Sequence, residues 1–241
     1  MTVAPTGRQL YLDLLKKCLT RYDLEAGADL DKRREGRDVS PAAETMIGLH
    51  RLENIEQCLK DVIQDEIPGD LIETGVWRGG AAIFMRAVLA AYGVGDRTVW
   101  VADSFEGLPK PDPEKYPSDR DSRLWKVPAL RVSLQEVKAN FAKYGLLDDN
   151  VRFLPGWFRD TLPDAPVERL ALLRLDGDLY ESTIQALDSL YPKLSPGGFA
   201  IVDDYGAAEA TAEAVNDYRA RHGIDDELVR IDWTGVFWRR S

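Results

Sequence analysis

The stretch from Leu71 to Gly80 reads LIETGVWRGG and joins a short apolar run to a helical stretch. Glycines at such a junction let a ligand come close to the backbone and let the chain turn tightly into the helix. The spacing G-x-x-x-G-G differs from the G-x-G-x-x-G pattern of dinucleotide-binding turns. The stretch therefore favours the first strand and helix of a Rossmann-like unit, although an ordinary strand-to-helix turn stays open at this point.

Outward from this stretch, short β-rich runs alternate with helical stretches, which indicates an α/β fold: a mostly parallel sheet with helices on both faces. The runs are densely apolar, as strands buried on both sides are. The expected strands are LIETGV (71–76), TVWVAD (98–103), VRFLP (151–155), LALLRLD (170–176) and GFAIVDD (198–204). The expected helices between them span 81–92, 134–144, 180–190 and 207–222. The closing runs ELVRID and VFWRR around WTG predict a C-terminal antiparallel hairpin at one edge.

Residues 1–66 precede the sheet, and we expect them to form a helical segment that covers part of the site. Residues 7–22 and 43–64 have the amphipathic pattern of surface helices. The charge run between them, Asp29 to Asp38 (DLDKRREGRD), predicts a solvated connection. The core is expected to span 67–241.

The segment 105–131 lacks a usable hydrophobic period and contains five of the chain's 13 prolines. A loop of this length inside a compact domain is usually a functional lid or a disordered segment. The segment directly follows the second expected strand, so it lies at the edge of the sheet where α/β proteins bind ligands. We therefore predict a lid near 105–131, in which Trp125 is the first aromatic side chain expected to contact an acceptor.

Composition and charge argue against several classes of protein. The 241 residues include 31 Lys and Arg against 41 Asp and Glu, and the net charge of −10 disfavours nucleic acid or an anionic membrane as the main partner. No apolar run reaches the roughly 20 residues that span a bilayer, and the N-terminus lacks a signal-peptide pattern. Cys18 and Cys58 lie on the apolar sides of expected helices, as buried free cysteines do, so we expect a reduced, cytoplasmic protein.

Acidic residues end several of the expected strands. Asp103 and Ser104 end the second strand, 23 residues beyond Gly80, where a carboxylate can accept hydrogen bonds from ribose hydroxyls. This combination indicates a cofactor that contains a nucleoside, without identifying it.

Four aspartates follow the next two strands: Asp176 and Asp178, then Asp203 and Asp204. Because parallel strands end at the same edge, these carboxylates are expected to converge, where they would repel one another by several kcal/mol. A divalent cation relieves that repulsion, and oxygen ligands suit magnesium. Two histidines and two cysteines are too few for a zinc or copper cluster. The alternative is that Asp178 and Asp204 cap the helices that follow them.

Five motifs in this order resemble those of the TylF-type sugar O-methyltransferases, a family that includes the macrocin, mycinamicin and noviose O-methyltransferases of antibiotic biosynthesis. The motifs are ETGVWRGG, VWVADSFEGLP, VRFLPGWF, LRLDGD and LSPGGFAIVDDY. The resemblance extends from the LYLDLL run at Leu10 to the terminal GVFWRR and so covers nearly the whole chain. It implies a class I methyltransferase fold and an enzyme that uses S-adenosylmethionine and Mg²⁺ to methylate a sugar hydroxyl of a glycosylated natural product. It also implies a homo-oligomer.

The resemblance further implies roles for individual residues. Asp178 is the expected general base, and the expected magnesium ligands are Asp176, Asp203 and Asp204. The expected cofactor-binding residues are Glu73, Thr74, Gly75, Val76, Asp103, Ser104, Gly156, Trp157, Phe158 and Asp176. The residues expected near the acceptor, from the resemblance or from their positions, are Met46, His50, Trp125 and Tyr180. The substrate-facing parts, 22–43 and 119–131, depart from the pattern of the relatives.

Three other functions stay open at this level. A nicotinamide-dependent oxidoreductase also uses a glycine turn and a ribose-binding aspartate, but the glycine spacing is wrong for it and four aspartates would be unexplained. An O-methyltransferase for a phenolic or catechol acceptor would use the same metal chemistry. A non-catalytic cofactor-binding protein would have no need of the acidic groups.

Overall fold

The apolar run of the 71–80 stretch forms β1 (Asp70–Thr74), an inner strand of a seven-stranded sheet. In this computed structural model, which describes residues 4–241, the strand order is β3-β2-β1-β4-β5-β7-β6. Strands β1 to β5 are parallel, and β7 runs antiparallel to its two neighbours. The other strands are β2 (Val99–Asp103), β3 (Val151–Pro155), β4 (Leu170–Leu175), β5 (Leu194–Val202), β6 (Val229–Arg230) and β7 (Val236–Arg239). The predicted α/β sheet with a C-terminal antiparallel hairpin is confirmed.

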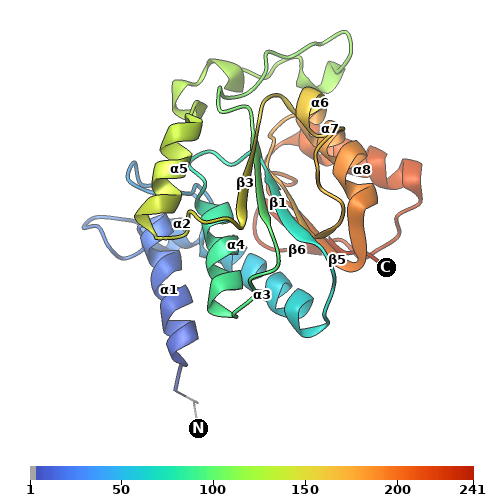
Figure 1. Cartoon of the computed structure of the whole chain (residues 1–241). Helices are drawn as coiled ribbons and strands as arrows, with labels where there is room; N and C mark the ends of the chain where they lie inside the picture. Colours follow the sequence, from blue (N-terminus) through green and yellow to red (C-terminus); the bar gives the residue numbers. More distant parts are fainter. Residues whose placement is uncertain (1–3) are drawn as a thin grey trace.

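Two hydrophobic cores lie on the two faces of the sheet, because successive side chains of a strand point to opposite sides. Leu71 packs into one core and Ile72 into the other. The first core is covered by α1 (Gly7–Thr20), α3 (Leu49–Gln64), α4 (Gly80–Ala91) and α5 (Leu134–Lys143). The second is covered by α6 (Phe158–Thr161), α7 (Tyr180–Leu190), η4 (Tyr191–Lys193) and α8 (Glu209–His222). Figure 1 shows the two layers of helices on either side of the sheet.

The second N-terminal helix is shorter than its sequence pattern predicts, and the prediction of a helix from residue 43 is wrong. Helix α3 begins at Leu49 after an extended Gly48, and residues 43–47 instead cross the start of α4. There the Gly80 backbone N–H donates to the Glu44 carbonyl oxygen (2.9 Å), and a Cβ at Gly80 would lie only 2.5 Å from that oxygen. Gly80 therefore makes room for the protein's own chain rather than for a ligand.

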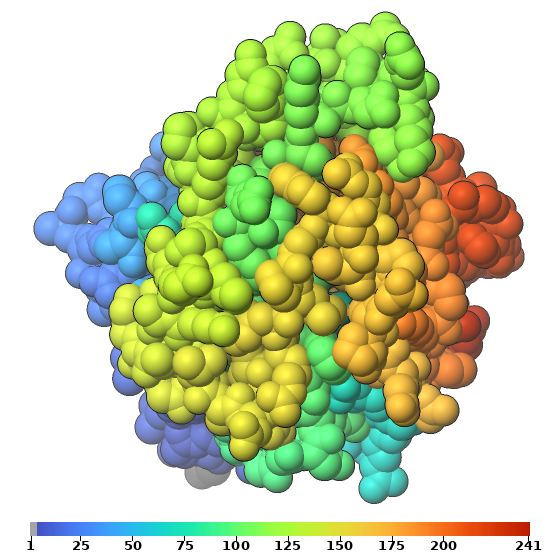
Figure 2. Space-filling model, turned by 45° about the horizontal axis from the view of Figure 1, so that its top comes forward, coloured from blue at the N-terminus to red at the C-terminus, as the bar shows by residue number. Residues whose placement is uncertain are grey.

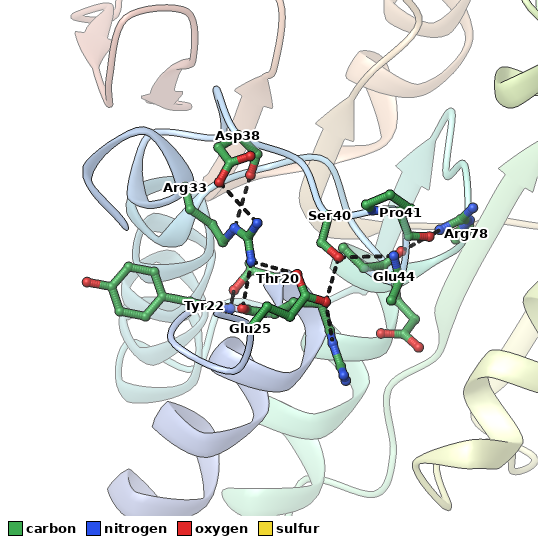
Figure 3. A network of polar contacts seen from close by, with 12 residues as sticks. Thr20, Tyr22, Glu25, Arg33, Asp38, Ser40, Pro41, Glu44 and Arg78 are labelled. Atoms are coloured by element: carbon green, nitrogen blue, oxygen red, sulfur yellow. Dashed lines mark hydrogen bonds and ion pairs between the residues drawn. The ribbon is translucent and has the colours of Figure 1, made fainter. Parts of the chain in front are cut away.

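The charge run 29–38 is not merely a solvated connection, which corrects a second prediction. It contains α2 (Leu30–Arg34), whose Arg33 is buried among partners from three segments (Figure 3). The Arg33 guanidinium donates to Glu25 Oε2 (3.0 Å) and to Asp38 Oδ2 (3.0 Å), and the Ser40 hydroxyl donates to Glu25 Oε1 (2.8 Å). A buried guanidinium needs such partners. These contacts hold residues 21–48, hereafter the N-terminal cover, in one arrangement.

The 105–131 segment runs across the end of the molecule where the parallel strands terminate (Figures 1 and 2). It contains three short 3₁₀ helices, η1 (Pro117–Asp119), η2 (Leu124–Lys126) and η3 (Pro128–Leu130). Its middle is fastened to α7, because the buried Asp119 carboxylate accepts from the backbone N–H groups of Tyr180 (2.7 Å) and Glu181 (2.9 Å).

Across residues 4–241, no helix has the length and apolar character that crossing a membrane requires.

Candidate active site

A cavity of about 700 Å³, partly open to solvent, lies at the carboxyl ends of the parallel strands. The 105–131 segment, the ends of β1 to β4 with the turns after them, α6, α7 and one residue of the N-terminal cover contribute to its lining. The expected site residues that line it are Met46, Gly75, Asp103, Ser104, Trp157, Phe158, Asp176 and Asp178. Sequence reasoning did not single out Glu181, Ser182 and Gln185, which α7 adds to the lining.

Asp103 lies on the cavity wall at the end of β2 and is held by the turn after β1. Its Oδ2 accepts from the Val76 backbone N–H (2.7 Å) and its Oδ1 from the Phe105 backbone N–H (2.7 Å). Each carboxylate oxygen has a further lone pair, so the group can still accept from hydroxyls of a ligand. The turn depends on Gly75, whose φ is +82° and whose missing side chain avoids a collision with the Asp176 carbonyl. Burial raises the pKa of the Asp103 carboxyl.

Three of the predicted carboxylates converge beside this cavity. Asp176, Asp203 and Asp204 each offer an oxygen, and these oxygens lie within 4.8 Å of one another. Asp204 Oδ2 is buried without a hydrogen-bond partner among residues 4–241. Burial, followed by the nearby Asp178, Asp176 and Asp203, raises the pKa of Asp204 well above its ordinary value. A hard divalent cation with oxygen ligands fits this donor set and would satisfy the orphaned oxygen.

Asp178 lies on the cavity wall, two residues before α7 begins. Its backbone has a φ of +59°, an uncommon conformation that Asp tolerates better than most residues. Burial raises the pKa of this carboxyl to about 7, and the charges of Asp176 and Asp203 add to the effect. A carboxyl that gains and loses its proton near neutral pH suits general acid–base chemistry.

The alternative that Asp178 and Asp204 are helix caps is wrong. The N-cap residue of α7 is Leu179, and the first N–H groups of that helix donate to Asp119 instead. The N-cap residue of α8 is Ala208, whose N–H donates to the Asp204 backbone carbonyl and not to its side chain. Both carboxylates are therefore free for other uses.

Two buried arginines neutralise much of the acidic cluster, and the sequence analysis missed both. Arg174 on β4 contacts Glu73 (Nη1 to Oε1, 2.5 Å), Asp176 (Nη1 to Oδ2, 2.8 Å) and Asp203. Arg51 on α3 contacts Asp203 through Nη1 and Asp232 through Nε (3.0 Å). Arg174 could have been found as the single charged residue within the apolar run LALLRL. Arg51 gives no such signal.

The structure does not bring all expected residues to the cavity wall. Glu73 and Thr74 are buried behind it, and Glu73 pairs with Arg174. His50 Nδ1 lies 3.6 Å from Glu53 Oε2 on the same helix, and the Tyr180 hydroxyl donates to Asp217 Oδ2 (3.0 Å). The expected residues outside the cavity lining are Glu73, Thr74, Val76, Gly156, Asp203, Asp204, His50, Trp125 and Tyr180. Val76 and Gly156 are nevertheless next in sequence to residues of the wall, and Asp203 and Asp204 each have a carboxylate oxygen within 4.8 Å of one on Asp176, which lines it.

The strand order and the cavity at the carboxyl ends of the strands define a class I methyltransferase fold. The crystal structure of CalS11, a calicheamicin methyltransferase, shares this fold with a TM-score of 0.63 and 19% sequence identity, over 98% of this chain and 94% of that chain. The structure of the O-methyltransferase NovP is much more similar, with a TM-score of 0.94 and 54% identity, over 98% of this chain and 100% of that chain.

Sequence comparison identifies the family. The model of the macrocin-O-methyltransferase (TylF) family matches residues 8–240. The 8-demethyl-8-(2,3-dimethoxy-alpha-L-rhamnosyl)-tetracenomycin-C 4'-O-methyltransferase of Streptomyces olivaceus is 56% identical, over 98% of this chain and 94% of that protein. The mycinamicin III 3''-O-methyltransferase of Micromonospora griseorubida is 52% identical, over 98% of each protein. The chain belongs to the macrocin-O-methyltransferase family and is an O-methyltransferase.

Proposed function

We propose that the protein transfers a methyl group from S-adenosylmethionine to a sugar hydroxyl of a glycosylated natural product of the antibiotic type, with Mg²⁺ held by Asp176, Asp203 and Asp204. One observation carries this proposal. A single cavity wall joins Asp103, at the end of β2, to Asp176 and Asp178, at the end of β4, beside the converging carboxylates. The residue proposed to bind the nucleoside, the proposed cation ligands and the proposed base are thus neighbours.

For the cofactor, family membership implies S-adenosylmethionine, and the wall offers matching chemistry. We assign the ribose to Asp103, whose oxygens keep unused lone pairs. Trp157 and Phe158 line the same cavity and are suited to the flat adenine ring, together with Ser104. The methionine part would lie along the turn from Glu73 to Val76, with Gly75 exposed to the cavity.

Mg²⁺ bound at the acidic cluster would act as a Lewis acid that stabilises negative charge on a sugar oxygen. Asp178, which lines the same wall, would take the proton of that hydroxyl, which is otherwise a weak nucleophile at neutral pH. Positioned acid–base groups of this kind contribute about 10²–10⁴-fold to a rate. Bound S-adenosylmethionine would supply the methyl group from its sulfonium sulfur to that oxygen, and Asp178 would hold the proton that the hydroxyl gives up.

The acceptor is assigned by analogy with the relatives. The Streptomyces olivaceus enzyme is named for methylation of a rhamnosyl-substituted tetracenomycin, and the relative from Streptomyces niveus is a demethyldecarbamoylnovobiocin O-methyltransferase (53% identical, over 96% of this chain and 94% of that protein). Met46, from the N-terminal cover, lines the same cavity as Leu108 and Leu130 of the 105–131 segment. We infer that cover and lid enclose the acceptor and keep water from the reacting oxygen.

Calorimetric titration and a methyl-transfer assay test this proposal. We expect S-adenosylmethionine to bind at micromolar concentration and NADH not to bind, with Asp103→Asn weakening cofactor binding by about 10- to 100-fold, as loss of a hydrogen bond to a charged group does. With labelled cofactor and Mg²⁺, a rhamnosylated aromatic aglycone should be methylated and a catechol should not. Methylation of the catechol alone would replace the sugar acceptor with a phenolic one.

A further inference from the structure

The side chain of Arg51 connects three parts of the molecule that are distant in sequence. It begins on the first turn of α3, is 5% exposed, and contacts Asp203 at the end of β5 and Asp232 in the turn between β6 and β7. A Cβ at Gly36, in the N-terminal cover, would collide with Arg51 Nη2, so the cover packs directly on the guanidinium. We propose that Arg51 is a positioning residue that sets Asp203 for the cation and makes cation binding depend on the docked N-terminal cover.

The first step of the argument concerns the orientation of Asp203. Its two oxygens are divided between two arginines: Oδ1 accepts from Arg174 and Oδ2 from Arg51. With Arg174 alone, the Asp203 carboxylate could still rotate, because Oδ2 would have no partner. Arg174 and Arg51 together fix the plane of the carboxylate. Partners of this kind keep metal ligands in their binding geometry, and their removal costs about 10- to 100-fold in metal affinity.

The second step connects this pair to the cover. The Trp233 indole N–H, next to Asp232, donates to the Glu35 carbonyl (2.8 Å), and the Arg37 guanidinium lies 4.7 Å from the centre of the Trp233 ring. The cover therefore packs on the same turn whose Asp232 carboxylate forms an ion pair with Arg51 Nε, without the geometry of a hydrogen bond. Since the network of Arg33 in Figure 3 makes the cover one unit, displacement of its 35–37 turn would disturb Arg51 and with it Asp203.

The inference rests on the proposed cation site, and its test measures binding apart from turnover. Mg²⁺ titration by calorimetry is performed on the wild type, Arg51→Met, Arg51→Lys and Asp232→Asn. We expect Arg51→Met to weaken Mg²⁺ binding by about 10- to 100-fold. Arg51→Lys should recover part of that loss, and Asp232→Asn, which leaves Asp203 untouched, should show a smaller loss of the same sign. Binding of S-adenosylmethionine should be unchanged in each variant.

Trypsin supplies a second readout, because the cover contains Lys32, Arg34 and Arg37. Mg²⁺ should slow cleavage of the wild-type cover and have no such effect in Arg51→Met. The matched control is Arg86→Met, which removes another buried arginine; neither Arg86 nor its partner Asp148 (2.6 Å) lines the cavity or belongs to the acidic cluster. That variant should lose stability but keep the Mg²⁺ affinity and the protection of the cover.

The outcomes separate the possible roles. Unchanged or tighter Mg²⁺ binding in Arg51→Met would overturn the inference, because Arg51 would then be only a counter-charge that competes with the cation. If Arg51→Met fails to fold, the Mg²⁺ affinities of Arg51→Lys and Asp232→Asn decide: an affinity equal to or higher than that of the wild type would overturn the inference. Absence of Mg²⁺ binding by the wild type, with S-adenosylmethionine still bound, would instead refute the cation part of the proposed function.

Discussion

At the scale of single residues, Asp178 offers the cleanest test of catalysis. Replacement by Asn keeps the size of the side chain and tolerates the positive φ, but removes the group that accepts the proton. We expect Asp178→Asn to lower kcat by about 10²–10⁴-fold. Calorimetry should find S-adenosylmethionine bound as tightly as in the wild type. A variant with nearly normal kcat would remove Asp178 from the reaction.

The residue scale also shows what a sequence reveals of a site. The aspartates at 103, 176, 203 and 204 were predicted from their places at strand ends, and the structure brings them to one edge of the sheet. Of the two arginines that balance their charge, Arg174 leaves a signal in its apolar run, but Arg51 was not predictable, because it is distant in sequence from every partner that it neutralises. The sequence pattern identifies which residues lie at the ends of strands. Ion pairs between elements depend on how those elements pack, which the pattern does not reveal.

At the scale of elements, the start of α7 depends on a cap from the lid. The Asp119 carboxylate accepts from the N–H groups of Tyr180 and Glu181. We expect Asp119→Ala to reduce the free energy of unfolding by about 1–2 kcal/mol, as loss of a cap does. It should also lower kcat, because α7 carries Glu181, Ser182 and Gln185 into the cavity wall and begins beside Asp178.

The matched control is a cap on another helix. The Ser133 hydroxyl accepts from the Glu136 N–H at the start of α5 (3.2 Å), away from the cavity lining. Chemical denaturation of both variants measures the free energy of unfolding, and steady-state kinetics measures kcat. Ser133→Ala should lose a comparable amount of stability and keep kcat, and equal kinetics of the two variants would contradict the role of the lid in placing α7.

A buried ion pair joins helix α1 to α3 and makes the free energy of unfolding depend on pH. Lys16 Nζ lies 2.8 Å from Glu56 Oε2, and both side chains are buried. Burial alone would raise the pKa of Glu56, but hydrogen bonds from Lys16 and Lys60 outweigh it and lower that pKa. A lowered pKa stabilises the folded state above the unfolded pKa, and the contribution is lost as the pH falls through the folded pKa.

Thermal or urea unfolding of Glu56→Gln measures this contribution. At pH 7 the wild type should be more stable by about 1–3 kcal/mol, the value of a hydrogen bond to a charged group. The difference should begin to shrink as the pH falls below about 4.3, where Glu56 is protonated in the unfolded state first, and should disappear only once the pH passes below the lowered pKa of the folded state. A difference that stays constant from pH 7 to pH 3.5 would show that the charge of Glu56 is irrelevant.

The errors of sequence reasoning at this scale have a common physical cause. The strands and the core helices were predicted to within a few residues, because burial on both faces imposes long apolar runs. Residues 43–48 have a helical pattern but form an irregular, bent stretch, since a hydrogen bond from Gly80 to Glu44 fixes them at the start of α4 and Gly48 packs against the backbone of residues 34–36. Tertiary contacts outweighed local propensity there.

At the scale of the whole molecule, the N-terminal cover, the 105–131 segment and the sheet edge all contribute to the lining of one cavity. The cover reaches the acidic cluster through Arg51, and the lid reaches α7 through Asp119. The cover and the 105–131 segment therefore each contact residues that lie next to the proposed reacting groups. Self-association and a cytoplasmic location stay predictions from the sequence.

The central claim, Mg²⁺-assisted methylation of a sugar hydroxyl, is tested most directly by transfer of a labelled methyl group to a rhamnosylated aromatic aglycone before and after chelation. We predict that the wild type labels the sugar, that EDTA abolishes labelling and that added Mg²⁺ restores it. Asp204→Asn should require more Mg²⁺ for the same rate, since it loses a charged ligand. Labelling of the sugar that is indifferent to EDTA and to Mg²⁺ would contradict the claim.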